Sequence, residues 1–115
     1  MKRGSVVLVA IRGSYGKPRP CVVVQTDEEA LSFDSITVCP MTTFGDRPHF
    51  LRPAVMPSAG NGLDAISHVQ IEKVITVSRA HVGSVIGSLS IEDMVQVDVG
   101  LATHLGLLAS IPADL

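Results

Sequence analysis

The chain has 115 residues, of which 46% are hydrophobic and 17% charged, and its net charge is −2 at pH 7. These values indicate one globular domain spanning residues 1–115, and they exclude a disordered chain or one that attracts nucleic acid through bulk charge. Only 3% of the residues are aromatic and Trp is absent. The core must therefore be built from Val, Ile and Leu, which favours β-structure.

In chain order, the apolar runs predict short strands at residues 5–10, 20–25, 35–41, 50–56, 63–69 and 72–77. Polar loops are expected at residues 12–18, 26–34 and 42–48. Pro53 interrupts the fourth run, so that strand is expected at an edge of the sheet. Five or six short strands at this spacing indicate a small barrel or a strongly bent sheet.

The last third of the chain predicts a helix. Ser90 is the expected N-cap, followed by acidic residues in the first turn, and Gly106 is the expected stop. The alternation in residues 95–99 also fits a strand, but the length, the cap and the stop favour a helix. The apolar residues expected on one helical face are Ile91, Met94, Val95, Leu101, Ala102 and Leu105. The expected fold class is therefore mainly β with a C-terminal helix.

The cysteines and histidines indicate neither a metal site nor a redox centre. Cys21 and Cys39 lie in expected buried strands and form no CxxC motif, so we expect buried, reduced thiols. The four histidines are scattered and show no ligand spacing. No apolar run approaches the length of a membrane span, and no signal-peptide core follows Met1. We expect a cytoplasmic protein without a metal, another cofactor or a membrane partner.

The stretch Lys17-Pro18-Arg19-Pro20 precedes the second expected strand. Proline fixes its own φ and biases the preceding residue towards extended geometry, so Arg19 is held at the mouth of that strand. An arginine anchored there can hold an anion. The alternative is that Lys17 and Arg19 are solvated loop charges that keep a sheet edge soluble. Basic residues dominate up to residue 25, which allows a local basic surface on an acidic protein.

Other polar residues follow the later strands. Thr42 and Thr43 follow the third strand and Gln70 follows the fifth. Because antiparallel neighbours place the start of one strand beside the end of the next, Arg19 and Thr42 can meet. A planar guanidinium and a hydroxyl form a phosphate-binding set. The alternative is that the threonines cap a turn through their own backbone.

Several segments together resemble the MazF/PemK toxin family. They are Arg3–Val9, Gly16–Gln25, Val38–Thr43, Gly62 through Ile71, Ile75–Val77 and Ile86–Leu89. The resemblance runs in order from residue 3 to about residue 108. Each motif alone is moderately specific, whereas their order and spacing together are strongly so.

The resemblance implies a small SH3-like β-barrel of the CcdB/MazF toxin type, assembled as a homodimer. It implies the toxin of a type II toxin–antitoxin system, an endoribonuclease (mRNA interferase) that cuts single-stranded RNA at a short sequence without a metal. A cognate antitoxin protein is the implied partner, with DNA reached only through that antitoxin. The family's catalytic Arg and Thr fall on Arg19 and Thr42, or on Thr43 if the Thr position is shifted by one.

The chemistry fits these residues. Attack of the 2′-hydroxyl on the adjacent phosphate builds negative charge, which Arg19 and Thr42 would stabilise, leaving 2′,3′-cyclic phosphate and 5′-hydroxyl ends. Cations in the first two loops would contact phosphates, and the loop tyrosine would stack on a base. The expected RNA-binding residues are Arg12, Tyr15, Lys17, Thr43, Arg47 and Gln70.

The sequence departs from the family at residues 67–70. Some members carry Arg-x-Asp-Gln there, and this chain has Ser67-His68-Val69-Gln70, without the Arg and the Asp. His68 is a candidate substitute, or else a residue engaged only in strand pairing. Two alternative functions therefore stay open: a non-catalytic binding protein like the gyrase poisons of the same fold, and a toxin that has lost cleavage.

Overall fold

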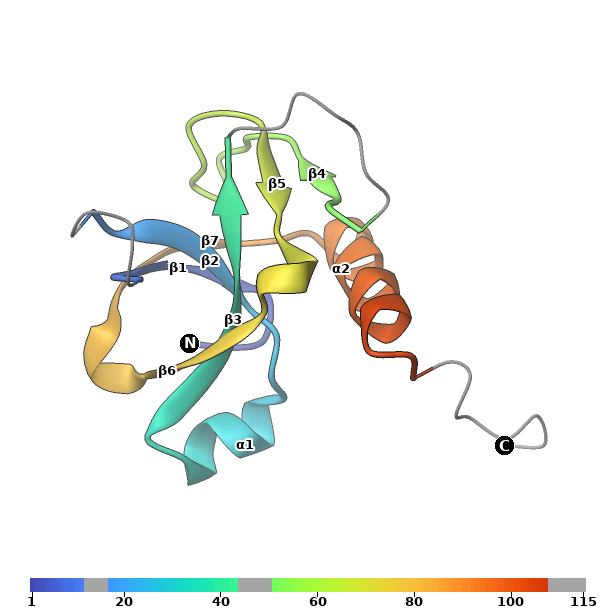
Figure 1. Cartoon of the computed structure of the whole chain (residues 1–115). Helices are drawn as coiled ribbons and strands as arrows, with labels where there is room; N and C mark the ends of the chain where they lie inside the picture. The colour runs from blue at the N-terminus through green and yellow to red at the C-terminus, as the bar shows by residue number, and fades with distance from the viewer. Residues whose placement is uncertain (12–16, 44–50, 108–115) are drawn as a thin grey trace.

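The computed structural model describes residues 1–11, 17–43 and 51–107, except for the side chains of residues 29–31. Within these ranges an antiparallel sheet has the strand order β4-β5-β3-β2-β1-β7, with β6 also paired to β3 (Figure 1). The strands are β1 Ser5–Val9, β2 Arg19–Val23, β3 Ser35–Thr42, β4 Ala54–Val55, β5 Ser67–Val69, β6 Ile75–Ser78 and β7 Val82–Ser88. The helices are α1 Asp27–Ser32 and α2 Ile91–His104, with single 3₁₀ turns η1 Ile71–Lys73 and η2 Arg79–His81.

Strand β3 is the longest strand and changes its partner along its length. Its first half pairs with β6, ending at Val38↔Ile75, and its last two residues pair with β5, starting at Met41↔Val69. The change falls at Pro40, which has no N–H to donate. The Pro40 carbonyl instead accepts a hydrogen bond from the backbone N–H of Gln70 at 2.8 Å. The sheet therefore divides at Pro40 and curves into a half-barrel.

Alternate residues of β1, β2 and β3 enter two separate cores, as the period of a strand requires. One face builds what we call the strand core, against which residues of β6 and β7 also pack. The other face builds what we call the helix core, which lies beneath α2. The strand core contains Val7, Val9, Cys21, Val23, Ile36 and Val38. The helix core contains Val6, Val22, Val24, Cys39, Met41, Val55, Leu63, Val69, Ile71, Leu89 and Val97. Sheet residues thus pack on both faces.

Helix α2 begins and ends where the sequence predicts. The Ser90 hydroxyl accepts a hydrogen bond from the Asp93 N–H at 3.1 Å, which is the expected N-cap. At the other end Gly106 adopts φ +69°, and the N–H of Leu107 returns to the carbonyl of Ala102 at 2.9 Å, closing a Schellman-type turn. The predicted helix and both of its end signals are confirmed.

Arg3 joins the N-terminal segment to the residue after β2, to α1 and to α2. Its guanidinium donates to the Val24 carbonyl at 2.8 Å and to the Asp98 carboxylate on α2, and its backbone N–H donates to Asp27 at 2.7 Å. Its charge is therefore used within the fold, and it adds little to the local basic surface that the sequence allows near the N-terminus.

The mainly β fold with a C-terminal helix is confirmed, and so are the strands expected at residues 5–10, 20–25 and 35–41, within two residues at each end. The expected strand at 63–69 is confirmed only at Ser67–Val69. The expected strand at 72–77 begins at Ile75, because residues 71–73 turn through η1. Within the described part of the expected 50–56 strand, Ala54–Val55 forms the strand β4 at the sheet edge, as Pro53 predicts, and Arg52 forms an isolated bridge. None of the described helices is long and apolar enough to cross a bilayer.

The structure departs from the sequence analysis in three places. The expected loop at residues 26–34 contains α1, and residues 82–88 form a strand, β7, that the sequence does not predict. The expected apolar face of α2 is only partly buried, because the helix packs through Val97 and Gly100 while Ile91 is 80% exposed. Gly100 permits the close packing, since a Cβ there would lie 3.0 Å from Cγ1 of Ile71.

Gly87 holds β7 against the 57–62 turn, and its replacement tests that contact. A Cβ at residue 87 would lie 2.4 Å from the carbonyl oxygen of Gly60, which is backbone and cannot rotate away. We expect Gly87→Ala to lower the free energy of unfolding by about 2 kcal/mol, measured by urea denaturation. Gly60→Ala is the matched control, since its Cβ would meet nothing closer than 3.8 Å. Equal stability of the two variants would contradict this packing.

The two thiols should make stability fall at alkaline pH. Burial raises the pKa of Cys21 and of Cys39 from 9.0 to about 12. Above pH 9 the unfolded chain releases thiol protons that the folded chain retains, so the free energy of unfolding should drop by about 1 kcal/mol per thiol between pH 9 and pH 10. Urea unfolding at pH 9 and pH 10 measures this drop. Cys39→Ala should remove one thiol's share, and an unchanged slope would refute the assignment.

Candidate functional site

Three polar side chains lie in one row across neighbouring strands at one end of the sheet. The β2–β3 ladder pairs Cys21 with Pro40, so two residues further along the same register Arg19 falls opposite Thr42. On the other side of β3, Thr42 pairs with His68 of β5. We call Arg19, Thr42 and His68 the cross-strand row. The meeting of Arg19 with Thr42 that the sequence predicts thus agrees with the strand register.

The row lies on a single face of the sheet. Residues directly opposite each other in an antiparallel ladder present their side chains on the same face, with Cβ atoms about 5 Å apart. Ser67 and Val69 are buried and His68 between them is half-exposed, which fixes the face on which His68 lies. Arg19 is exposed and Thr42 half-buried. An anion placed above Thr42 would therefore have a guanidinium on one side and an imidazole on the other.

Arg19 differs from the other described arginines in its bonding. Arg3 binds Asp98, Arg52 binds Glu72, and the Arg79 side chain donates to the Phe33 carbonyl at 2.9 Å. Within residues 1–11, 17–43 and 51–107, the guanidinium of Arg19 makes no hydrogen bond or ion pair. It is thus an exposed cation whose donors are not used by any of the described residues. Such a group is suited to a planar anion such as a phosphate.

Of the other predicted site residues, three lie near the cross-strand row and three lie outside the described residues. Lys17 is exposed and lies two residues before Arg19. Gln70 is half-buried beside Pro40, next in the ladder after Val69. Thr43 is exposed and directly follows the row. The predicted RNA contacts Arg12, Tyr15 and Arg47 lie outside the described residues.

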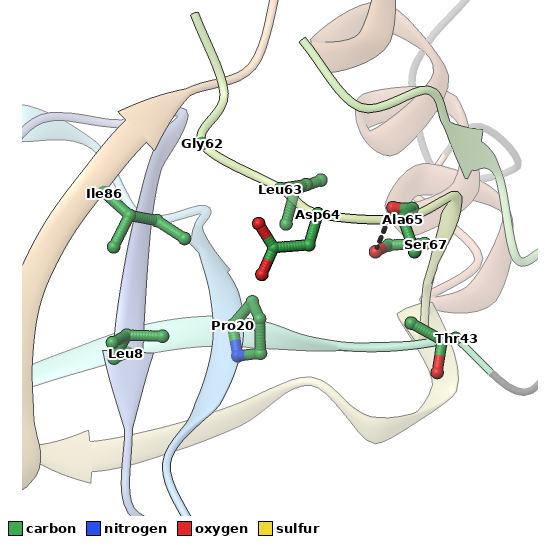
Figure 2. A pocket seen from close by; sticks show the side chains of 9 residues that line it. All are labelled: Leu8, Pro20, Thr43, Gly62, Leu63, Asp64, Ala65, Ser67 and Ile86. Carbon is green, nitrogen blue, oxygen red and sulfur yellow. Dashed lines mark hydrogen bonds between the residues drawn. The ribbon is translucent and has the colours of Figure 1, made fainter. Parts of the chain in front are cut away.

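A pocket of about 300 Å³ adjoins the ends of β1, β2 and β3 (Figure 2). Its wall is mainly apolar, and Figure 2 shows the carboxylate of Asp64 pointing into it. Pro20, Thr43 and Ser67 line it, and each is the chain neighbour of a residue of the row. Because successive residues of a strand face opposite sides, the pocket and the row lie on opposite faces of the same strand ends.

An ion pair fixes the edge strand next to the site. The Arg52 guanidinium donates two hydrogen bonds, at 3.0 and 3.1 Å from its Nε, to the Glu72 carboxylate, and a third from Nη2. The hydrogen bond from Arg52 lowers the pKa of Glu72, and the same bond raises the pKa of Arg52. The pair joins residue 52, beside β4, to η1, and so supports the strand that carries His68.

Sequence reasoning singles out Arg19 and Thr42 as candidates, but it could not place His68 beside them. The signal was present, since His68 stands in the segment where this chain departs from the family that its sequence resembles, but the pairing partner of that segment was unknown. The pocket and Asp64 were missed, because the pocket is lined by segments that lie far apart in the sequence, from Leu8 to Ile86. Among the described residues, no three His, Cys, Asp or Glu side chains gather in a way that could hold a metal.

Comparison with known proteins gives consistent results. A sequence profile described as PemK-like, MazF-like toxin of type II toxin–antitoxin system matches residues 2–105. A probable endoribonuclease MazF from Mycolicibacterium smegmatis is 39% identical over 111 residues, which cover 93% of this chain and 98% of that protein.

Solved structures with the same fold are also known. An endoribonuclease in complex with its cognate antitoxin, from a mycobacterial species, superposes with a TM-score of 0.79 at 22% identity, covering 93% of this chain and 96% of that one. A MazE–MazF structure from Deinococcus radiodurans superposes with a TM-score of 0.73 at 16% identity, covering 92% and 96%. At these identities the superpositions establish the half-barrel fold with its C-terminal helix.

Proposed function

This chain belongs to the PemK-like, MazF-like toxins of type II toxin–antitoxin systems, and we propose that it is an endoribonuclease that cuts single-stranded RNA through Arg19 and Thr42. The observation that carries the proposal is the cross-strand row, in which an exposed arginine without a partner among the described residues faces a strand-end threonine. The related probable endoribonuclease supports the activity. The relatives give no support to a gyrase poison or to a toxin without cleavage.

The chemistry follows from where charge develops. Attack of a 2′-hydroxyl on its own 3′-phosphate gives a pentacoordinate phosphorane with more negative charge than the ground state. A guanidinium in the row stabilises that charge by donating to two phosphate oxygens, and the Thr42 hydroxyl holds a third. The nucleophile comes from the RNA itself, so the step needs no activated water. The products are a 2′,3′-cyclic phosphate and a 5′-hydroxyl.

The partners follow from the family. We propose that a cognate antitoxin neutralises the protein and that the toxin acts as a homodimer in the cytoplasm, where RNA is available and thiols stay reduced. A mycobacterial relative with this fold was solved with its cognate antitoxin. Exposed apolar residues on α2 give the chain a surface suited to a partner, namely Ile91, Val95 and Val99.

Replacing Arg19 tests the activity directly. Purified protein is incubated with a long, largely unstructured RNA in excess EDTA, and the fragment ends are mapped. We expect discrete cuts with 5′-hydroxyl ends, and Arg19→Ala should slow them about 10³-fold, because a donor to the transition state is lost. Lys2→Ala removes one exposed cation at the opposite end of the sheet and should cut normally. A folded Arg19→Ala protein with normal activity would rule out the catalytic assignment.

The two threonines can be separated by the same assay. Thr42 lies in the row and Thr43 lines the pocket on the other face. Thr42→Val keeps the shape and removes the hydroxyl, and we expect kcat to fall about 10²-fold because one transition-state donor is lost. Thr43→Val should leave kcat within about threefold and act on KM if RNA reaches the pocket. A larger loss of kcat in Thr43→Val would reverse the assignment.

A further inference from the structure

We propose that His68 is the general acid of the reaction, donating its proton to the 5′-oxygen that leaves when the RNA is cut. This inference rests on the proposed function. It starts from the ladder between β3 and β5, in which His68 is the direct partner of Thr42. Residue type alone would not separate His68 from His81 and His104, since only the strand pairing places one of them beside the threonine.

The position of the His68 ring is set by its neighbours in β5. Ser67 is 3% exposed and its hydroxyl donates to the Ala65 carbonyl at 3.1 Å, while Val69 is fully buried in the helix core. Both therefore face inward, and His68 between them faces the side of Thr42 and Arg19. Along the part of the chain that the structure describes, its imidazole makes no hydrogen bond or ion pair. The ring has no structural contact of that kind to satisfy.

The geometry of the row matches an in-line displacement. Adjacent strands lie about 4.8 Å apart, so Arg19 and His68 flank Thr42 with their backbones roughly 10 Å from each other. A phosphate above Thr42 would lie between the guanidinium and the imidazole. In an in-line reaction the attacking and leaving oxygens occupy opposite sides of phosphorus. A single imidazole on one side can therefore serve one of the two, and the arginine stabilises the charge from the other side.

The leaving oxygen is the one that needs a proton from the protein. The 2′-oxygen–phosphorus bond forms and the phosphorus–5′-oxygen bond breaks. The 2′-hydroxyl proton passes to water, and the imidazolium proton ends on the 5′-oxygen, which would otherwise depart as a strongly basic alkoxide. Water then reprotonates the ring. Arginine stays protonated and cannot transfer the proton, whereas histidine exchanges one near neutral pH.

The residues around His68 are compatible with an imidazole that donates a proton to a bound phosphate ester. The residues that lie beside it in the ladder are Thr42 on β3 and Ala54 on β4, and both are uncharged. Arg19, one strand further, is the charged group of the row. Asp64 lines the pocket on the other face of these strand ends. No described carboxylate shares the row, so a phosphate bound there would meet no competing carboxylate among the described residues.

The test uses a leaving group that needs no proton. Two oligonucleotides carry one ribonucleotide at the mapped cut site in an otherwise deoxy chain, one with the normal 5′-oxygen and one with sulfur in its place. A thiolate leaves unprotonated. We expect His68→Gln to slow cleavage of the oxygen substrate by about 10²- to 10⁴-fold, and to cut the sulfur substrate within about tenfold of the wild-type rate. His68→Asn should behave in the same way.

His104→Gln is the matched control, because it makes the same chemical change on the exposed last turn of α2 and should alter neither rate. Thermal unfolding confirms that each variant is folded. An equal loss on both substrates, or no loss on either, would overturn the role of His68. A wild-type protein that cuts neither substrate would overturn the proposed function instead.

Discussion

The structure depends on the way β3 shares its two edges. One edge pairs with β2 and fixes Arg19 opposite Thr42; the other is divided between β6 and β5 at Pro40. If β3 slipped by one residue, its core residues would turn to the wrong faces and Thr42 would leave the row. The same alternation that fills both cores therefore holds the row in register. Packing and the proposed chemistry share one constraint.

The strands rich in Val and Ile could be predicted because their apolar residues are continuous, and the helix α2 because its cap and its glycine stop are local. The six-residue helix α1 is too short to show a 3.6-residue period. Strand β7 contains Gly83 and Gly87, which dilute the strand pattern. Gly87 is there because the Gly60 carbonyl passes too close for a side chain, a tertiary contact that no local pattern reveals.

The candidate site, like the fold, could be predicted only where its signals are local. Proline on either side of Arg19 marks it in the sequence, whereas the roles of Arg3, Arg52 and Arg79 appear only when their partners are placed. The inward face of α2 was misjudged for a related reason. The helix approaches Ile71 through Gly100, and a glycine contributes nothing to an apolar pattern. Local chemistry identifies candidates, and long-range pairing decides which of them share a surface.

The pairing of β1 with β7 bears on when the molecule becomes complete during synthesis. β1 is made first, yet one of its two edges stays open until residues 82–88 exist, and Arg3 meets its α2 partner only at residue 98. Contacts between such distant segments form slowly and late. A growing chain on the ribosome thus lacks part of the sheet that supports Arg19 until most of the chain has been translated. The ribosome has therefore translated most of the mRNA for this chain before the nascent protein can complete the sheet around Arg19.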